Sequence, residues 1–121
     1  LANLHVLPRK QFLEKMEELA SAYDGLSMSE IGKQLYKKHS CNTCHTVDGS
    51  VVIGPSWLGL YGTKREFNKA SSVIADDNYI RESILYPSKK VSRGYRDVMN
   101  SYADMKEEDI AALIEYMKTL K

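Results

Sequence analysis

Two cysteines and a histidine fall within five consecutive residues, Cys41-Asn42-Thr43-Cys44-His45. The chain has no other cysteine, so a disulfide framework cannot organise its fold. The pattern C-x-x-C-H is typical of covalent haem attachment. Two thiols three positions apart on one helical turn can reach two vinyl groups on one porphyrin edge, and the adjacent imidazole can then bind the iron. The sequence therefore predicts haem c bound through Cys41 and Cys44, with His45 as an iron ligand.

Three other interpretations of the pentapeptide stay open at this point. A zinc site could use both cysteines, His45 and His39, although structural zinc sites rarely have this ligand spacing. A thioredoxin-like redox pair would need a βαβ context, which the sequence does not show. The pattern could also occur by chance.

Length and charge set broad limits on the chain. Its 121 residues suit one domain, and no run of about 18 apolar residues predicts a membrane-spanning helix. The net charge of +1 gives no reason to expect a nucleic-acid partner. The chain has no signal peptide and begins with Leu1, so we expect a piece of a longer protein.

Helical periodicity predicts an all-α fold. A capping box at Ser27 to Glu30 marks one helix start, and Asp104 or a water is expected to cap the last helix because Lys106 is a poor cap. The predicted helices are 8–26, 27–39, 76–86 and 107–120, with a further short helix near 64–70. Long irregular stretches between them are unusual unless a large group organises them.

Several motifs around the pentapeptide resemble class I cytochromes c. Gly32-x-x-x-Tyr36 precedes it, Tyr116 supplies a matching aromatic residue, and Gly54-Pro55 follows it in a run that ends at Gly59. The resemblance implies crossed N- and C-terminal helices around one haem c, with an extra amphipathic helix at the N-terminus of this chain. It also implies that the Pro55 carbonyl accepts a hydrogen bond from the His45 ring.

The resemblance places the second iron ligand late in the chain, where Met99 and Met105 are the candidates. We predict Met99, because Met99-Asn100-Ser101-Tyr102 resembles the family's Met-Pro-x-Phe/Tyr and most methionines are packing residues. Asn100 in place of proline predicts a more flexible ligand loop. A six-coordinate iron has no open position, which favours a one-electron carrier over a haem enzyme or a five-coordinate sensor. Candidate propionate partners are Trp57, Tyr61, Lys64, Arg65 and Tyr79.

The first residues resemble the end of the cupredoxin domain in subunit II of haem-copper oxidases, to which some bacteria fuse a cytochrome c domain. The expected division is 1–7 as the end of that strand or a linker, 8–26 as a linker helix, and 27–121 as the cytochrome c domain. The implied partners are a respiratory donor, the copper-centre domain and the catalytic subunit of a terminal oxidase. The implied location is the periplasm or the outer face of the cytoplasmic membrane, with the membrane reached only through the parent chain. A free-standing soluble cytochrome c is the alternative.

Overall fold

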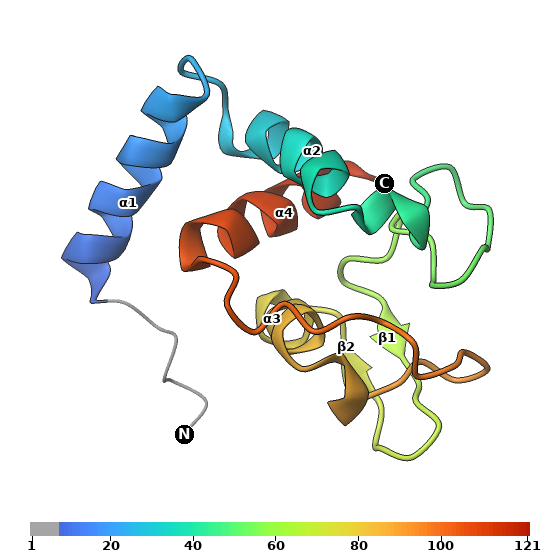
Figure 1. Ribbon diagram of the computed structural model, residues 1–121. Helices are drawn as coiled ribbons and strands as arrows, with labels where there is room; N and C mark the ends of the chain where they lie inside the picture. Colours follow the sequence, from blue (N-terminus) through green and yellow to red (C-terminus); the bar gives the residue numbers. More distant parts are fainter. Residues whose placement is uncertain (1–7) are drawn as a thin grey trace.

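The computed structural model describes residues 8–121, so the predicted strand end at 1–7 lies outside the described part. The helices are α1 (Arg9–Ala22), α2 (Met28–Lys38), α3 (Asp77–Leu85) and α4 (Glu107–Thr119), with short 3-10 helices at Cys41–Thr43 and Pro87–Lys89 (Figure 1). The only other regular elements among these residues are β1 (Lys64–Arg65) and β2 (Val73–Ile74). The all-α class is confirmed.

The prediction of a short helix near residues 64–70 was wrong. β1 pairs with β2 in an antiparallel hairpin, with Lys64 opposite Ile74 and Arg65 opposite Val73. The connecting loop is held by Asn68, whose side chain donates to the Tyr95 carbonyl at 3.1 Å and accepts from the Gly94 N–H at 3.1 Å. These bonds link segments 26 or more positions apart, and local helical periodicity carries no information about them.

The two helix starts differ. The capping box of α2 is present: the Glu30 N–H donates to the Ser27 hydroxyl, and the Ser27 N–H donates to the Glu30 carboxylate at 3.0 Å. At α4, Lys106 occupies the N-cap position without a side-chain bond, so the expectation of Asp104 as the cap was wrong, while a capping water stays a prediction. Three acidic residues in the first turn of α4 instead favour its N-terminus electrostatically.

The scaffold is the crossing of α2 over α4 (Figure 1). A Cβ placed on Gly32 would lie 2.0 Å from the Ala112 carbonyl oxygen, so only glycine allows this approach. The Tyr36 and Tyr116 rings pack beside the crossing with centroids 5.7 Å apart. Ile31, Leu35, Ile110 and Leu113 are the largest fully buried side chains, so the core lies between the two helices.

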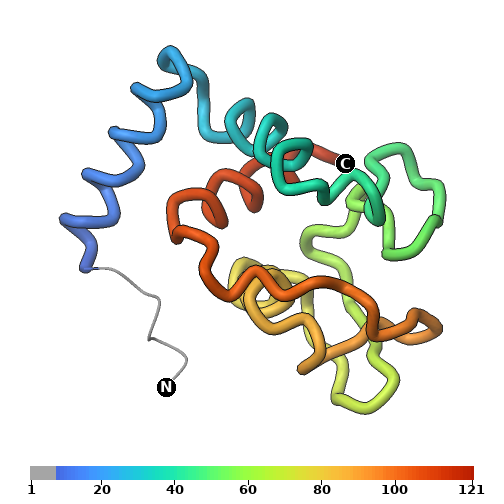
Figure 2. The backbone as a smooth tube through the Cα atoms, in the orientation of Figure 1, coloured from blue at the N-terminus to red at the C-terminus, as the bar shows by residue number. Residues whose placement is uncertain are grey.

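The segment between α3 and α4 returns across α3, as the tube in Figure 2 shows. Two hydrogen bonds fix it there: the Tyr102 N–H donates to the Ile84 carbonyl at 3.1 Å, and the Ser101 hydroxyl donates to the Leu85 carbonyl at 2.8 Å. The Tyr102 hydroxyl reaches the His39 carbonyl at 2.8 Å. These contacts hold the neighbouring Met99 opposite the C-x-x-C-H segment.

The helix α1 begins immediately after Pro8 and has no buried residue. Leu19, Ala20 and Tyr23 at its C-terminal end pack against the core, whereas Leu13 is 45% exposed. The helix therefore contacts the domain at one end and projects from it at the other (Figure 1). The proposed boundary between residues 26 and 27 stays a prediction.

Candidate haem site

The C-x-x-C-H segment folds as one tight turn directly after α2. Ser40 adopts a left-handed conformation with φ of 60°, which ends the helix, and the His45 N–H then donates to the Cys41 carbonyl at 2.9 Å. Cys41 and Cys44 are half-buried. Burial raises the pKa of the Cys41 thiol to about 11.

The imidazole of His45 is held in one orientation. Its Nδ1 lies 2.8 Å from the Pro55 carbonyl oxygen, an acceptor that fixes Nδ1 as the protonated nitrogen. A Cβ on Gly54 would lie 2.5 Å from His45 Cε1, so the glycine forms a cradle for the ring. Burial lowers the pKa of His45, and the bond to Pro55 opposes that shift. A neutral ring results, with Nε2 left to bind a metal.

The hydroxyl of Tyr36 donates to the His45 carbonyl and ties the ligand backbone to α2. The Trp57 ring packs against the imidazole with centroids 5.7 Å apart. Both aromatic residues are buried. The histidine is therefore fixed by its backbone, by one ring nitrogen and by one ring face.

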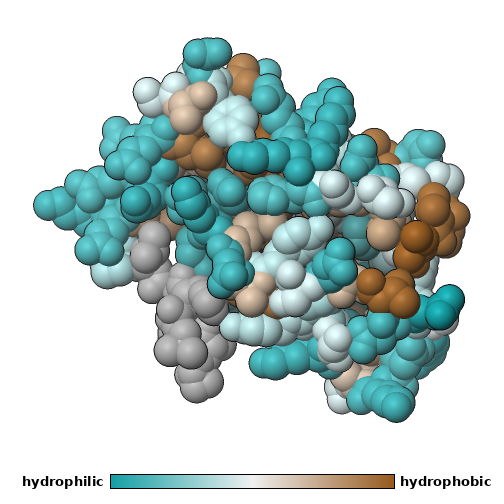
Figure 3. Space-filling view, viewed as in Figure 1, coloured by the Kyte–Doolittle hydropathy of each residue, from teal (hydrophilic) through white to brown (hydrophobic). Residues whose placement is uncertain are grey.

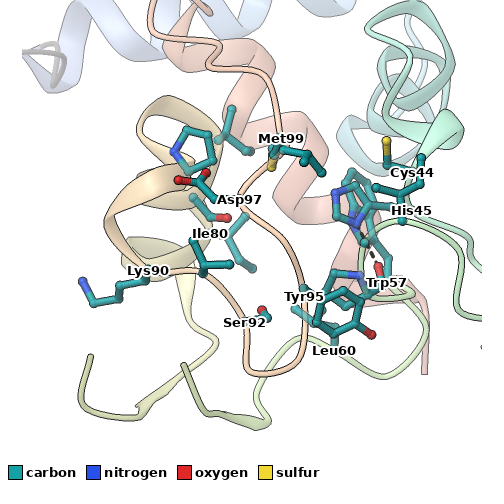
Figure 4. Close-up of a pocket in the computed structure, with 18 of the residues that line it drawn as sticks. Cys44, His45, Trp57, Leu60, Ile80, Lys90, Ser92, Tyr95, Asp97 and Met99 are labelled. Carbon is teal, nitrogen blue, oxygen red and sulfur yellow. Dashed lines mark hydrogen bonds between the residues drawn. The ribbon is translucent and has the colours of Figure 1, made fainter. Parts of the chain in front are cut away.

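His45 faces an open pocket whose empty space, counted together with its mouth, is about 840 Å³. An adjoining hollow of about 680 Å³ shares five lining residues with it and also reaches Cys41. The shared residues are Cys44, His45, Trp57, Ile84 and Met99. Figure 4 shows Met99 and His45 approaching the pocket from different segments, with Cys44 beside His45.

The two candidate methionines occupy different surroundings. Met99 is half-buried and lines both hollows. Met105 is 9% exposed, belongs to the core cluster and lines only the smaller hollow. The structure thus brings Cys41, Cys44, His45 and Met99 around one space, with the Pro55 carbonyl behind the imidazole.

The sequence analysis missed part of the pocket wall. Trp57 and Tyr79 line the pocket, whereas Tyr61, Lys64 and Arg65 are not among its lining residues. The polar wall comes from the irregular segment after α3 and consists of Lys90, Ser92, Tyr95, Arg96 and Asp97. The segment shows no helical or strand periodicity in its hydrophobic residues. Its aromatic and basic residues could still have indicated that it lines the expected cofactor site.

The donor set fits haem c better than zinc. Within residues 8–121, no group of three or more His, Cys, Asp or Glu side chains is placed to hold a metal ion, so the predicted alternative with His39 does not form. Three features of the site suit a flat iron porphyrin. The backbone at Gly54 leaves room for the His45 ring, the imidazole is neutral and held in one orientation, and the pocket is apolar with a thioether in its wall.

Comparison with known proteins agrees with this geometry. Residues 29–121 match the family model described as cytochrome c. Cytochrome c oxidase subunit 2 of Alkalihalophilus pseudofirmus is 32% identical over 96 residues, which are 78% of this chain but 26% of that protein. Cytochrome c2 iso-2 of Magnetospirillum molischianum is 30% identical over 90 residues, 67% of this chain and 91% of that protein. Cytochrome c2 iso-1 of Magnetospirillum fulvum is 29% identical over 92 residues, 69% of this chain and 93% of that protein.

The fold and these matches define a class I cytochrome c domain, and the chain belongs to the cytochrome c family. Its cofactor is one covalent haem c with its iron, and its work is electron transfer with redox partner proteins. Domains of this family are carriers, not catalysts, and typically work outside the cytoplasm. The chain spans about a quarter of the oxidase subunit that it matches. None of the helices described in residues 8–121 has the length and apolar character needed to cross a membrane.

Proposed function

We propose that Cys41 and Cys44 form the two thioether bonds to haem c, and that His45 and Met99 are the axial iron ligands. The observation that carries this assignment is the pairing of His45 and Met99 on one pocket, with His45 Nδ1 bound to the Pro55 carbonyl at 2.8 Å. The bound haem supplies a reversible one-electron Fe(III)/Fe(II) couple. His45 and Met99 would hold the iron through an imidazole nitrogen and a thioether sulfur, and a thioether ligand would raise its reduction potential.

Substitution of each methionine tests the ligand. Met99→Ala in the haem-loaded protein is expected to open the sixth position, so that the reduced form binds carbon monoxide, and to lower the reduction potential. Met105→Ala is the control and is expected to cost stability while the spectrum stays unchanged. Carbon monoxide binding by Met105→Ala alone would show that the assignment of Met99 is wrong. Ready binding by the wild type would favour a five-coordinate sensor or enzyme.

For the physiological role, we propose that the domain passes electrons from a respiratory donor to the dinuclear copper centre of a haem-copper oxygen reductase. The similarity to an oxidase subunit 2 supports this role, as does the resemblance of the first residues to the end of a cupredoxin domain. The domain would then lie in the periplasm or at the outer face of the cytoplasmic membrane, anchored only through its parent chain. Its partners would be the copper-centre domain and the catalytic subunit.

A free-standing carrier is the second candidate, because the match covers nine-tenths of two cytochromes c2. The parent sequence before Leu1 and the kinetics of the full chain separate the two roles. An oxidase fusion requires Cys, His and Met copper ligands upstream and a haem oxidation rate that does not depend on protein concentration. A free carrier requires a rate proportional to the concentration of a separate acceptor, and this result would overturn the oxidase role.

A further inference from the structure

The apolar stripe of α1 is longer than the part of it that packs on the domain. At the C-terminal end of the helix, Leu19 and Tyr23 contact the core. Phe12, Leu13 and Met16 continue the same stripe toward the N-terminus at helical spacing. Among the described residues, none of these three belongs to the core or packs against it, and Leu13 is 45% exposed. We call Phe12, Leu13 and Met16 the outer stripe.

A hydrogen-bonded turn sets the direction of α1. Asp24 and Gly25 both adopt left-handed conformations, with φ of 56° and 73°. The Gly25 N–H donates to the Ala20 carbonyl at 2.8 Å, and the Leu26 N–H donates to the Tyr23 carbonyl at 3.2 Å. These bonds close the end of the helix and fix the angle at which α1 leaves the domain (Figure 1). The N-terminal half of α1, with the outer stripe, therefore projects from the core.

The opposite face of α1 is polar and suits solvent. Its exposed residues are Gln11, Glu14, Glu17, Glu18 and Ser21. The left side of the space-filling view, where α1 lies, is accordingly hydrophilic (Figure 3). The helix has 14 residues, and a helix of about this length is marginal in water without tertiary packing. Because α1 packs on the core at one end only, its first turns gain support only if the outer stripe is covered.

The charge at the N-terminal end of α1 is basic. Arg9 and Lys10 are exposed and form no ion pair within residues 8–121. The first turn holds no acidic residue, and basic side chains there oppose the helix dipole. A carboxylate over this turn would pair with Arg9 and Lys10 and would also favour the dipole. The charge therefore complements an acidic partner.

We propose that the outer stripe is an interface with the domain that precedes it in the parent chain, and that the face it contacts there is apolar at its centre and acidic at its rim. In the oxidase fusion proposed above, on which this inference rests, that domain is the copper-centre domain. Residues 1–8 would join it to α1, and eight residues span at most about 29 Å when fully extended. Such a tether keeps the preceding domain at a high effective concentration beside Arg9 and the outer stripe, so a small interface suffices. The helix α1 would then pack on one domain at each end.

Hydrogen exchange of the haem-loaded parent chain and of the 121-residue chain tests this interface. We expect the backbone amides of residues 12–17 to exchange at least about ten-fold more slowly in the parent chain than in the 121-residue chain. The amides of residues 20–24 are the internal reference, because they lie where α1 already meets the core, and should exchange equally in both.

Two variants and a matched control identify the contacting surface. Leu13→Gln keeps a similar helix propensity and is expected to remove the added protection in the parent chain. Glu14→Gln, on the polar face, is the control and should retain it. Arg9→Glu should reduce the protection in the parent chain, although an acidic first turn would favour the helix in the 121-residue chain. A residue that acted only through helix stability would shift both chains in the same direction.

Equal exchange of residues 12–17 in the two chains would overturn the interface, as would equal effects of Leu13→Gln and Glu14→Gln. Protection in the 121-residue chain that rises with protein concentration would show that a second copy covers the outer stripe, and would also overturn it. The oxidase role fails separately, if the sequence before Leu1 lacks Cys, His and Met copper ligands. Added protection in such a parent chain would retain the interface and exclude the copper-centre domain as its partner.

Discussion

Gly32 in α2 lies so close to Ala112 in α4 that an added Cβ would come within 2.0 Å of the Ala112 carbonyl oxygen and 2.7 Å of Tyr116 Cβ. Neither neighbour can rotate away, since one is backbone and the other is the first atom of a buried side chain. The distance between α2 and α4 is thus possible only because Gly32 has no side chain. The core and the position of the haem pocket follow from that distance.

Substitution of Gly32 by alanine should therefore force α2 and α4 apart. We expect Gly32→Ala to lower the free energy of unfolding by about 1–3 kcal/mol, the usual cost of overpacking, in spite of the better helix propensity of alanine. Urea denaturation of the haem-loaded protein measures this cost. Lys33→Ala, on the exposed side of the same helix, is the control and should be nearly neutral. A Gly32→Ala variant as stable as the wild type would contradict the close crossing.

A second prediction concerns Gly54, which has no side chain and so leaves room for the His45 ring. The Gly54→Ala variant would place a Cβ 2.5 Å from His45 Cε1, so we expect the imidazole to tilt and its bond to the Pro55 carbonyl to weaken. The reduction potential and the ferric spectrum should change. Lys33→Ala, on the exposed side of α2, is the comparison, since it should leave both the potential and the ligand spectrum unchanged. An unaltered potential in Gly54→Ala would show that the cradle does not orient the ligand.

Much of this site follows from the sequence because its signals are local. The C-x-x-C-H segment, the Ser27 capping box and the Gly54-Pro55 pair lie within a few residues of the groups they act on. The crossing at Gly32 was predicted from a resemblance, and the structure supplies its physical reason. The β1 and β2 hairpin was missed because it depends on Asn68 and Tyr95, which are 27 positions apart. The polar pocket wall was missed for the same reason, since it forms only when the irregular segment folds back on α3.

The capping box at the start of α2 predicts a pH dependence. Hydrogen bonds from the Ser27 backbone N–H and hydroxyl lower the pKa of Glu30 below its ordinary value of 4.5. A carboxylate with a lowered pKa stabilises the folded state above its unfolded pKa, and this contribution is lost as the pH falls through the folded pKa. We expect Glu30→Gln to be less stable than the wild type at pH 7 and to approach it below about pH 4. Thermal unfolding across that range measures the difference, and a constant gap would count against the linkage.

The last prediction concerns the Tyr36 hydroxyl, which donates a hydrogen bond to the His45 carbonyl in a buried site. Tyr36→Phe keeps the ring packing but leaves that carbonyl without its partner, so we expect a loss of about 1–3 kcal/mol in the free energy of unfolding. Tyr116→Phe is the matched control: its ring packs in the same cluster, and its hydroxyl has no hydrogen-bond partner among the described residues. Denaturation of both variants should show a clear loss for Tyr36→Phe and little for Tyr116→Phe. Equal losses would mean that the hydroxyl does not secure the ligand backbone, and that Tyr36 contributes only its ring.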